Sequence, residues 1–396
     1  MEKNVKFGTR VVSGWKKPHA STRPINPPIY QSTSYIYDDM ESFMQGGSEA
    51  MLGKGGYFFY TRTGNPTNAM FEAKMAELEG GERALSFASG MAAISTTLFA
   101  LLKPGDRVVT HSKLYSASDT LFMEYLPSFG IEVEMVDLTD PREMKRALTK
   151  PAKAILIETP ANPLVDIIDV TEAARLAKQS GCITIVDNTW ASPYLMRPLE
   201  LGADLVASSS TKYISGHDDA LGGYVAGRAE LVSRIDNYLL VFGGAMSPMH
   251  AFYSMRGLRT LHVRMDRHCS NAMEAAKFLE SHPKVKKVSY PGLKSHPQHD
   301  VAKKMMSDYS GMIAFWLKGG VAEASALMKN LSVCNVAVSL GDCSTLIEHP
   351  ASMTHITLDR ARREKIGVTD NLLRLSVGLE DIHDIIRDLD RALTKV

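Results

Sequence analysis

A lysine and an aspartate each follow an apolar, β-branched run of the chain, and their spacing could bring them to one ligand. Asp187 comes directly after residues 183–186, and Lys212 lies shortly after a second such run at residues 204–207. Ligands of open α/β sheets bind outside the carboxyl ends of the strands. If the two runs are neighbouring strands, one ligand meets both an amine and a carboxylate.

Ser209 and Thr211 add two hydroxyl groups beside this lysine. A lysine for a Schiff base, an acid for a pyridinium nitrogen and donors for a phosphate are the parts of a pyridoxal 5'-phosphate (PLP) site. Burial would lower the pKa of Lys212, as imine formation requires. The carboxylate of Asp187 would keep the ring nitrogen protonated, so that the ring withdraws electrons from a substrate carbanion. Taken singly, the two residues could be a surface lysine and an acid in a strand-end turn.

A small-residue segment at 86–94 turns from an expected strand into an apolar helix. It places the backbone amides of Gly90 and Met91 at the helix N-terminus, where anions bind. The same pattern also serves packing of a helix on a sheet. The chain has neither a GxxxxGK[ST] motif nor a GxGxxG motif after a strand, so nucleotide binding lacks its main sequence support.

Aromatic and basic side chains elsewhere could complete the site. Tyr60 and Arg62 offer a phenol and a guanidinium, a pair suited to a phosphate dianion, although an ordinary loop is the alternative. Tyr115 follows the expected strand that ends at His111, so it could stack on a flat cofactor and act as an acid, or be a core residue. Arg374 lies in an apolar run and needs an anion, either the α-carboxylate of an amino acid or an internal acid.

Composition favours an intracellular protein with a small-molecule partner. The 396 residues carry 45 Lys and Arg against 44 Asp and Glu, so the net charge of +1 gives no reason to expect nucleic acid or an anionic membrane. The four cysteines form no CxxC pair, and we expect reduced thiols. We expect no metal site, because no metal-ligand spacing links His111, His217, His268 and His349. Without a long apolar run or a signal peptide, a soluble cytoplasmic protein is expected.

The order of the expected elements predicts an α/β protein with two domains and an N-terminal arm. Residues 1–62, rich in proline, glycine and polar residues, are interpreted as an extended arm that contacts a neighbouring subunit. Residues 63–248 alternate β-branched runs with helical stretches, which is typical of a mostly parallel sheet with helices on both faces. Residues 249–396 begin with a long helical stretch to about residue 280 and continue as a smaller C-terminal α/β domain. Its expected strands are at 285–290, 312–317, 333–339 and 372–377.

Six short motifs are spread from the arm to the last domain. They are Tyr-Thr-Arg at 60–62 with Gly-Asn-Pro-Thr at 64–67, Ser-Gly-Met-Ala-Ala-Ile at 89–94, Glu-Thr-Pro-Ala-Asn-Pro at 158–163, Val-Asp-Asn-Thr at 186–189, Ser-Ser-Thr-Lys-Tyr at 209–213 and Arg-Leu-Ser-Val-Gly at 374–378. Together they resemble the Cys/Met metabolism family of fold type I PLP-dependent enzymes, and the resemblance covers the whole chain. It implies a fold type I transferase-like architecture with PLP as cofactor.

The resemblance also implies roles for single residues. Lys212 would be the Schiff-base lysine and Asp187 the partner of the pyridinium nitrogen. Tyr115 would stack on the ring, and Asn162 would contact the phenolic oxygen. The phosphate would be held by Gly90, Met91, Ser209 and Thr211, joined by Tyr60 and Arg62 of a neighbouring subunit. Sites shared in this way make a dimer the minimum, and the family usually forms tetramers built from two dimers.

The substrate side shows departures from related enzymes. The resemblance implies that Ser339 and Arg374 bind the substrate carboxylate. Cystathionine enzymes tend to carry a glutamate just before this serine for the distal ammonium of cystathionine, whereas this chain has Val338. Burying that ammonium unpaired would cost on the order of a few kcal/mol, so an uncharged distal group fits better.

Within the family the chain is most similar to the methionine γ-lyases, through residues 255–261, 264–269, 339–342 and 349–355. Those enzymes typically carry a cysteine two residues after the stacking tyrosine, where this chain has Ala117. They also carry a Lys-Asp pair where, by an ungapped count, Leu239 and Leu240 stand. These three residues therefore indicate an altered distal pocket.

The predicted reaction is PLP-dependent γ-elimination from a homoserine- or homocysteine-type L-amino acid, giving 2-oxobutanoate, ammonia and the leaving group. Lys212 would act as base, and Tyr115 would protonate the leaving group. Alternatives are γ-replacement, as in O-acylhomoserine sulfhydrylases, a γ-lyase for an oxygen-linked substrate such as canavanine, and a cystathionine γ-lyase or γ-synthase. A scaffold with a vestigial site is the non-enzymatic alternative, and the presence of Lys212, Asp187 and Arg374 counts against it.

Overall fold

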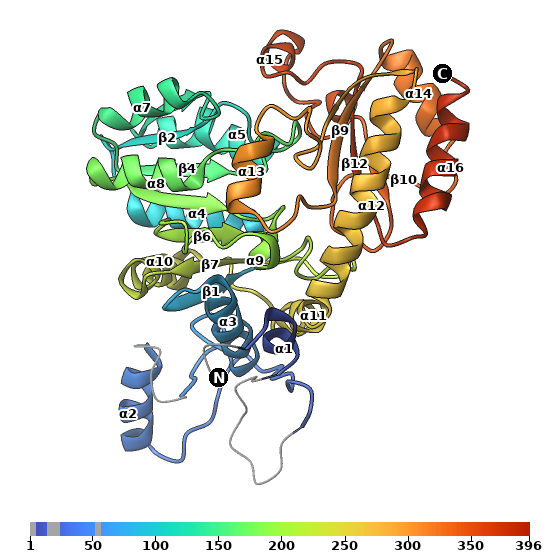
Figure 1. Ribbon diagram of the computed structural model, residues 1–396. Coiled ribbons are helices and arrows are strands. Elements are labelled where there is room, and N and C mark those ends of the chain that lie inside the picture. The colour runs from blue at the N-terminus through green and yellow to red at the C-terminus, as the bar shows by residue number, and fades with distance from the viewer. Residues whose placement is uncertain (1–4, 14–23, 52–56) are drawn as a thin grey trace.

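The computed structural model describes residues 5–13, 24–51 and 57–396 and contains two α/β units (Figure 1). The larger unit has a seven-stranded sheet in the order β1-β7-β6-β5-β4-β2-β3. Its strands are β1 Arg83–Phe87, β2 Arg107–His111, β3 Glu132–Val136, β4 Ala154–Glu158, β5 Ile183–Asp187, β6 Leu205–Ser208 and β7 Gly223–Gly227. β7 pairs antiparallel with β1 and β6, and the other neighbours are parallel. The predicted mostly parallel sheet is confirmed.

Helices cover both faces of this sheet. They are α3 Pro66–Glu79, α4 Gly90–Leu101, α5 Ser116–Thr120, the π-helix η1 Leu121–Tyr125, α6 Leu126–Ser128, α7 Pro141–Thr149, α8 Val170–Gln179, α9 Ser192–Leu195 and α10 Ala229–Phe242. Ile155 and Ile157 of β4 join the core beneath α3, α7 and α8, whereas Ala154 and Leu156 join the core beneath α4 and α10. Successive side chains of a strand point to opposite faces, so β4 is apolar on both.

The smaller unit is built on a five-stranded sheet in the order β10-β11-β12-β9-β8. Its strands are β8 Val285–Ser289, β9 Met312–Leu317, β10 Asn335–Val336, β11 Leu346–Glu348 and β12 Leu372–Ser376. Its helices are α13 His299–Met305, α14 Val321–Lys329, η2 Pro350–Ser352, α15 Arg360–Lys365 and α16 Ile382–Leu393. Leu327 of α14 and Leu389 of α16 pack with Phe315 of β9 in a core of their own. This confirms an α/β class for the C-terminal part.

The long helical stretch expected from residue 248 is two helices, α11 Pro248–Leu258 and α12 Leu261–Ser281. The buried guanidinium of Arg264 explains the break. Its Nη2 donates to the carbonyl of Gly257 at 2.7 Å, and its Nη1 donates to the carbonyl of Tyr213 at 2.7 Å. A carbonyl near the end of α11 is thereby satisfied without a continuous helix.

The N-terminal region is less extended than its composition predicts. It contains α1 Phe7–Val12 and α2 Met40–Met51, and Val11 of α1 is fully buried in the core beside α3. One apolar side chain on a short helix therefore anchors this region to the larger unit. Residues 1–4, 14–23 and 52–56 of the expected arm lie outside the described residues.

The strand expected at 333–339 is limited to β10, Asn335–Val336. Ser339 has a backbone φ of 83°, in the left-handed region that a strand cannot contain. The chain therefore leaves the sheet before Ser339 and continues as a loop.

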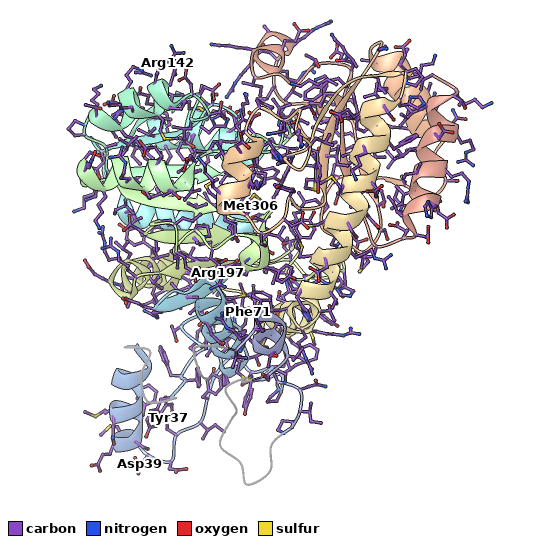
Figure 2. All side chains as sticks on the ribbon, in the orientation of Figure 1. Tyr37, Asp39, Phe71, Arg142, Arg197 and Met306 are labelled. Atoms are coloured by element: carbon purple, nitrogen blue, oxygen red, sulfur yellow. The ribbon has the colours of Figure 1, made fainter. Side chains whose placement is uncertain are left out.

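A buried acid lies between α3 and the larger sheet. The hydroxyl of Tyr224 donates to Oε1 of Glu79 at 2.6 Å, and both residues are fully buried. Phe71, which Figure 2 labels on α3, packs edge-on against Tyr224, and the two ring centroids are 6.2 Å apart. Burial raises the pKa of Glu79 to about 7, although the bond from Tyr224 lowers it. Glu79 is therefore a titratable group within the core.

Candidate active site

A cavity of about 440 Å³ opens at the carboxyl ends of β4, β5 and β6, with walls from both units. Because β5 lies between β4 and β6, Asp187 and Lys212 do follow neighbouring strands. The predicted site residues that line this cavity are Gly90, Met91, Tyr115, Asn162, Asp187, Ser209, Thr211, Lys212, Val338, Ser339 and Arg374. The structure thus brings together groups from segments far apart in the sequence.

Lys212 occupies a partly buried position on the cavity wall. It follows β6 in a turn fixed by Thr211, whose hydroxyl donates to the carbonyl of Gly222 at 3.1 Å. Nζ of Lys212 donates to Oγ of Ser339 at 2.8 Å. Burial lowers the pKa of Lys212, and the positive charge of Arg374 lowers it further. A lysine with a lowered pKa is a better nucleophile and base near neutral pH.

The carboxylate of Asp187 is held at the end of β5 by Thr189. Its Oδ1 accepts from the backbone N–H of Thr189 at 3.0 Å and from its hydroxyl at 2.6 Å. Oγ1 of Thr189 in turn accepts from the backbone N–H of Ser209 at 2.9 Å. Burial raises the pKa of Asp187, and the bonds from Thr189 act in the opposite direction. The orientation of the acid is therefore fixed together with the loop that leads to Lys212.

Glu158 stands beside Asp187 at the end of the neighbouring strand β4. Its Oε2 accepts from the backbone N–H of Tyr115 at 2.9 Å, and its Oε1 accepts from that of Asn162 at 2.8 Å. Burial raises the pKa of Glu158, and the charge of Asp187 adds to the increase. One buried carboxyl group thus positions two loops that line the cavity.

The opposite end of the cavity is formed by the start of α4. Oγ of Ser89 accepts from the backbone N–H of Ala92 at 3.0 Å and caps the helix. A Cβ atom added to Gly90 would stand 2.7 Å from Cβ of Ser209, so only glycine allows this close approach. The helix N-terminus, with its unpaired amides and partial positive charge, lies beside the hydroxyl of Ser209. This arrangement suits a phosphate.

Arg374 is almost fully buried and reaches the cavity from β12. Its Nη1 donates to Oδ1 of Asn162 at 2.9 Å, and its Nη2 donates to the carbonyl of Ser339 at 2.8 Å. Its Nε lies 3.2 Å from Oε1 of the buried Glu348. The internal acidic partner expected as one alternative is therefore present, and Arg374 also lines the cavity. The Glu348 pair orients the guanidinium toward the cavity.

The outer wall of the cavity is more exposed and more apolar. Tyr115, Leu221 and Val338 line it, and about half of each side chain of Leu221 and Val338 is accessible, at 54% and 50%. Tyr115 is 41% exposed, so its ring faces the opening and not a core. A distal substrate group would lie against these side chains.

Five predicted residues do not line this cavity. Arg62 is exposed, its Nη1 donates to the carbonyl of Leu240, and its guanidinium lies 5.5 Å from the ring centroid of Tyr60. Ala117 lies in α5, and Leu239 is buried in the core beneath α10. All five residues therefore lie outside the cavity of their own chain.

Some cavity residues were not singled out by the sequence. Glu158 had a usable signal, because an acid ends an otherwise apolar strand. Glu348, which pairs with Arg374 but does not itself line the cavity, had the same signal in the short run Leu346–Glu348. Trp190 lines the cavity, with its ring centroid 5.8 Å from the guanidinium carbon of Arg374, but its neighbours in sequence give no indication of this.

Among the described residues, no cluster of His, Cys, Asp and Glu could hold a metal ion. None of the described helices is long and apolar enough to cross a membrane. All four cysteines, Cys182, Cys269, Cys334 and Cys343, are free thiols.

The cavity residues fit PLP. The start of α4, cleared by Gly90, offers amides to a phosphate, and the buried carboxylate of Asp187 offers a partner to a pyridinium nitrogen. Lys212 lies on the same wall with a lowered pKa, as a lysine that binds an aldehyde requires. Fold and site together define a fold type I PLP-dependent enzyme.

Comparisons with known proteins agree with this class. The family model of the Cys/Met metabolism PLP-dependent enzymes matches residues 8–394, and the chain belongs to this family. It is 47% identical over 372 residues to an L-methionine gamma-lyase of Fusobacterium nucleatum subsp. polymorphum, which covers 93% of each chain. It is 43% identical over 389 residues to an L-methionine gamma-lyase of Pseudomonas putida, covering 98% of this chain and 97% of that protein.

Among solved structures, the chain is similar to a cystathionine gamma synthase from Xanthomonas oryzae pv. oryzae in complex with aminoacrylate and cysteine. The TM-score is 0.93 at 38% sequence identity, and 99% of each chain is covered. The predicted family, fold class and cofactor are thereby confirmed. The protein is a PLP-dependent enzyme that acts on a small amino acid.

Proposed function

We propose that the protein catalyses γ-elimination from an L-amino acid that carries a leaving group on Cγ. The products are 2-oxobutanoate, ammonia and the released group, which is a thiol if the leaving atom is sulfur. The observation that carries this proposal is that Ser339 contacts both Lys212 and Arg374. Its hydroxyl contacts Nζ of Lys212 at 2.8 Å, and its carbonyl contacts Nη2 of Arg374 at 2.8 Å. These contacts support the proposal that a base and a carboxylate-binding group would face one amino-acid substrate.

The bound cofactor would supply an electron sink for the negative charge that forms when a substrate C–H bond is broken. Lys212 would hold it covalently, Asp187 would pair with its ring nitrogen, and Asn162 would contact its phenolic oxygen. Gly90, Met91, Ser209 and Thr211 would hold the phosphate. These assignments are supported by the position of every one of these residues on the cavity wall.

Lys212 is the proposed base. Burial lowers the pKa of its amine, so that a larger share is unprotonated at neutral pH. The amine would remove the Cα proton of the substrate. Arg374 and Ser339 would hold the substrate carboxylate, which keeps Cα within reach of Nζ. Tyr115, whose side chain faces the cavity opening, is the proposed acid that protonates the leaving group.

The distal pocket favours an uncharged leaving group. Val338 and Leu221 form an exposed apolar wall on the side where that group would lie. An ammonium placed there would lose water without gaining a partner. The proposal for this chain is therefore a methionine γ-lyase-like activity. Cystathionine is a weaker candidate, although the structurally similar protein from Xanthomonas is named for cystathionine synthesis.

Two further reactions use the same cofactor residues. In γ-replacement, a nucleophile takes the place of the leaving group, as in O-acylhomoserine sulfhydrylases. Elimination of an oxygen-linked group, as in canavanine, is the other. Ala117, Leu239 and Leu240 are the departures that make a changed leaving group reasonable.

We further propose an oligomer with shared sites, at least a dimer and in full a tetramer of two dimers, located in the cytoplasm. Tyr60 and Arg62 would contact the phosphate in the site of a neighbouring subunit. Their exposure and their distance from the cavity of their own chain support this. The N-terminal region of 1–62 would be the contacting arm, and 63–248 and 249–396 would be the two domains.

The decisive experiment incubates the purified holoenzyme separately with methionine, homocysteine, cystathionine, O-acetylhomoserine and canavanine, each with and without sulfide. The assay measures 2-oxobutanoate, the product of elimination, and homocysteine, the product of replacement by sulfide. We expect ketoacid from methionine or homocysteine without sulfide. A product that forms only with sulfide would establish replacement, and no ketoacid from any compound would refute γ-elimination.

A further inference from the structure

The hydroxyl of Ser339 lies between two charged groups. Its Oγ accepts a hydrogen bond from Nζ of Lys212 at 2.8 Å and donates one to Oδ1 of Asp218 at 3.2 Å. A serine hydroxyl has one proton, and an ionised carboxylate can only accept. The proton therefore points toward Asp218, which leaves the oxygen lone pairs to Lys212.

The backbone at both ends of this contact is unusual. Ser339 has a φ of 83° and Asp218 a φ of 50°, both in the left-handed region. A non-glycine residue is disfavoured there and stays only where its surroundings fix it. The bond from Nη2 of Arg374 to the carbonyl of Ser339, at 2.8 Å, is one such restraint. The two residues are thus held in a conformation that aims both side chains at each other.

Several charged groups face Lys212. Arg374 of β12 opposes a positive charge on its amine, and Asp218 and Glu348 of β11 favour one. Asp187 of β5 and Glu158 of β4 lie on the same cavity wall. Glu348 is already paired with Arg374, at 3.2 Å. Asp218 is the carboxylate joined to Lys212 through one hydroxyl.

The charge of Asp218 is otherwise uncommitted. It is exposed, and it forms no ion pair within the described residues. The residues on either side of Asp218 form polar contacts with other partners. Nδ1 of His217 lies 2.7 Å from the carbonyl of Ser215, and Oδ1 of Asp219 accepts from the hydroxyl of Ser215 at 3.3 Å. Only one of the two adjacent acids therefore reaches the lysine.

We propose that Asp218 is a positioning residue, which holds the side-chain nitrogen of Lys212 through the hydroxyl of Ser339 and stabilises the protonated form of that nitrogen, both as the free amine and when it is bound to the cofactor. This inference rests on the proposed role of Lys212 as the cofactor-binding lysine and base. After Lys212 has taken a proton from the substrate, the carboxylate favours retention of that proton on Nζ. The same amine can then deliver it to another atom of the same substrate.

The test compares Asp218→Asn with Asp219→Asn. The first keeps an acceptor for Ser339 and removes the charge, and the second removes an equal charge one residue away. The readout is a pH titration of the visible absorbance of the bound cofactor in the holoenzyme, without substrate, which reports protonation at the Lys212 nitrogen. We expect the pH at the midpoint of the titration to be lower in Asp218→Asn by about 0.5–1 pH unit. The midpoint of Asp219→Asn should stay within about 0.2 of the wild type.

Kinetics provide a second readout. Since Asp218 does not touch the substrate, Asp218→Asn should lower kcat about 3- to 30-fold and change KM less than about twofold. The acid limb of kcat against pH should move to lower pH, because the amine loses its proton more readily. Asp218→Glu should restore part of kcat. In a Ser339→Ala background, Asp218→Asn should cause no further change in the absorbance midpoint.

An unchanged midpoint in both Asp218→Asn and Asp218→Ser, with cofactor bound, would overturn the proposal. An equal change in Asp219→Asn would also overturn it. The shift would then be explained by a general electrostatic effect of nearby negative charges. The absorbance titration uses no substrate. A normal shift together with failure to form 2-oxobutanoate would therefore count against γ-elimination and would support the role of Asp218.

Discussion

Asn162 and Arg374, 212 residues apart in the chain, meet through a 2.9 Å hydrogen bond from Nη1 to Oδ1. One residue lies in a loop after β4 of the larger sheet, and the other lies on β12 of the smaller sheet. The bond thus joins a residue assigned to the cofactor with one assigned to the substrate. The relative position of the two units therefore determines how the residue assigned to the cofactor and the residue assigned to the substrate lie in the cavity.

Arg374→Lys should raise KM about 10- to 100-fold, because an ammonium cannot form the paired bonds of a guanidinium with a carboxylate. Steady-state kinetics with the substrate that the incubation assay identifies measure this. Arg387→Lys is the control, since Arg387 is an exposed residue of α16 paired with Asp384. A KM of Arg374→Lys within about twofold of the wild type would remove Arg374 from the carboxylate site.

Lys212→Ala should abolish turnover and the visible absorbance of the bound cofactor, because no other amine is proposed to hold it. Activity and an absorbance spectrum of the purified variant test this. Lys178→Ala, at an exposed position of α8, should retain both. Retention of both properties by Lys212→Ala would show that the assignment of this lysine is wrong.

Gly90→Ala should weaken cofactor binding about tenfold or more, since its Cβ would stand 2.7 Å from that of Ser209 and displace the phosphate loop. The dissociation constant of PLP, measured by titration of apoenzyme, provides the value. Gly320→Ala is matched to it, because a Cβ there meets nothing within 4 Å. Equal affinities of the two variants would refute a phosphate site at Gly90.

Val338→Glu should shift the preference toward cystathionine about tenfold relative to a substrate with an uncharged distal group, because the new carboxylate can pair with the distal ammonium. The ratio of kcat/KM for the two substrates is the quantity to compare. Val336→Glu adds the same charge at a similarly exposed position, 49% against 50%, that does not line the cavity. If both variants change the ratio equally, Val338 does not contact the distal group.

Glu79→Gln should make stability less dependent on pH. Burial raises the pKa of Glu79 from 4.5 to about 7, so the folded protein binds a proton that the unfolded chain loses between these values. The stability contributed by neutral Glu79 is therefore full below about pH 4.5 and is lost as pH rises through about 7.

From pH 5.5 to pH 8 this group should reduce the free energy of unfolding by on the order of 2 kcal/mol. Thermal midpoints at the two pH values should differ less in Glu79→Gln, which keeps an acceptor for Tyr224. Glu143→Gln, at an exposed position of α7, serves as the control. A difference as large as in the wild type would mean that Glu79 is ionised in the folded protein at both pH values.

The parts of the site that the sequence predicted share a physical origin. Asp187 and Lys212 follow apolar runs, and parallel strands deliver the residues after them to one edge. Gly90 stands where a strand turns into a helix, and this pattern can be recognised from the neighbouring residues alone. The sheet was predictable from a similar local pattern, because the uninterrupted apolar run of β4 and those of its neighbours indicate burial on both faces.

The remaining parts depend on contacts between distant segments. Nothing near Asp218 in the sequence indicates that it meets Ser339, 121 residues later. No residue near Ser339 in the sequence predicts its left-handed backbone conformation. Because of this conformation, the strand ends earlier than expected. Leu239 is a core residue of α10, and an ungapped count of positions cannot distinguish a core residue from one that faces a second subunit.

The cavity wall is divided between rigid and exposed elements. Asp187 and Glu158 lie on buried strands, whereas Leu221 and Val338 are half-exposed residues of loops. Substitutions in loops are tolerated more readily than those in a buried sheet. After gene duplication, a few substitutions in these loops would therefore be enough to change the substrate while the inherited chemistry persists. The type of reaction would be the slowest property of the lineage to diverge.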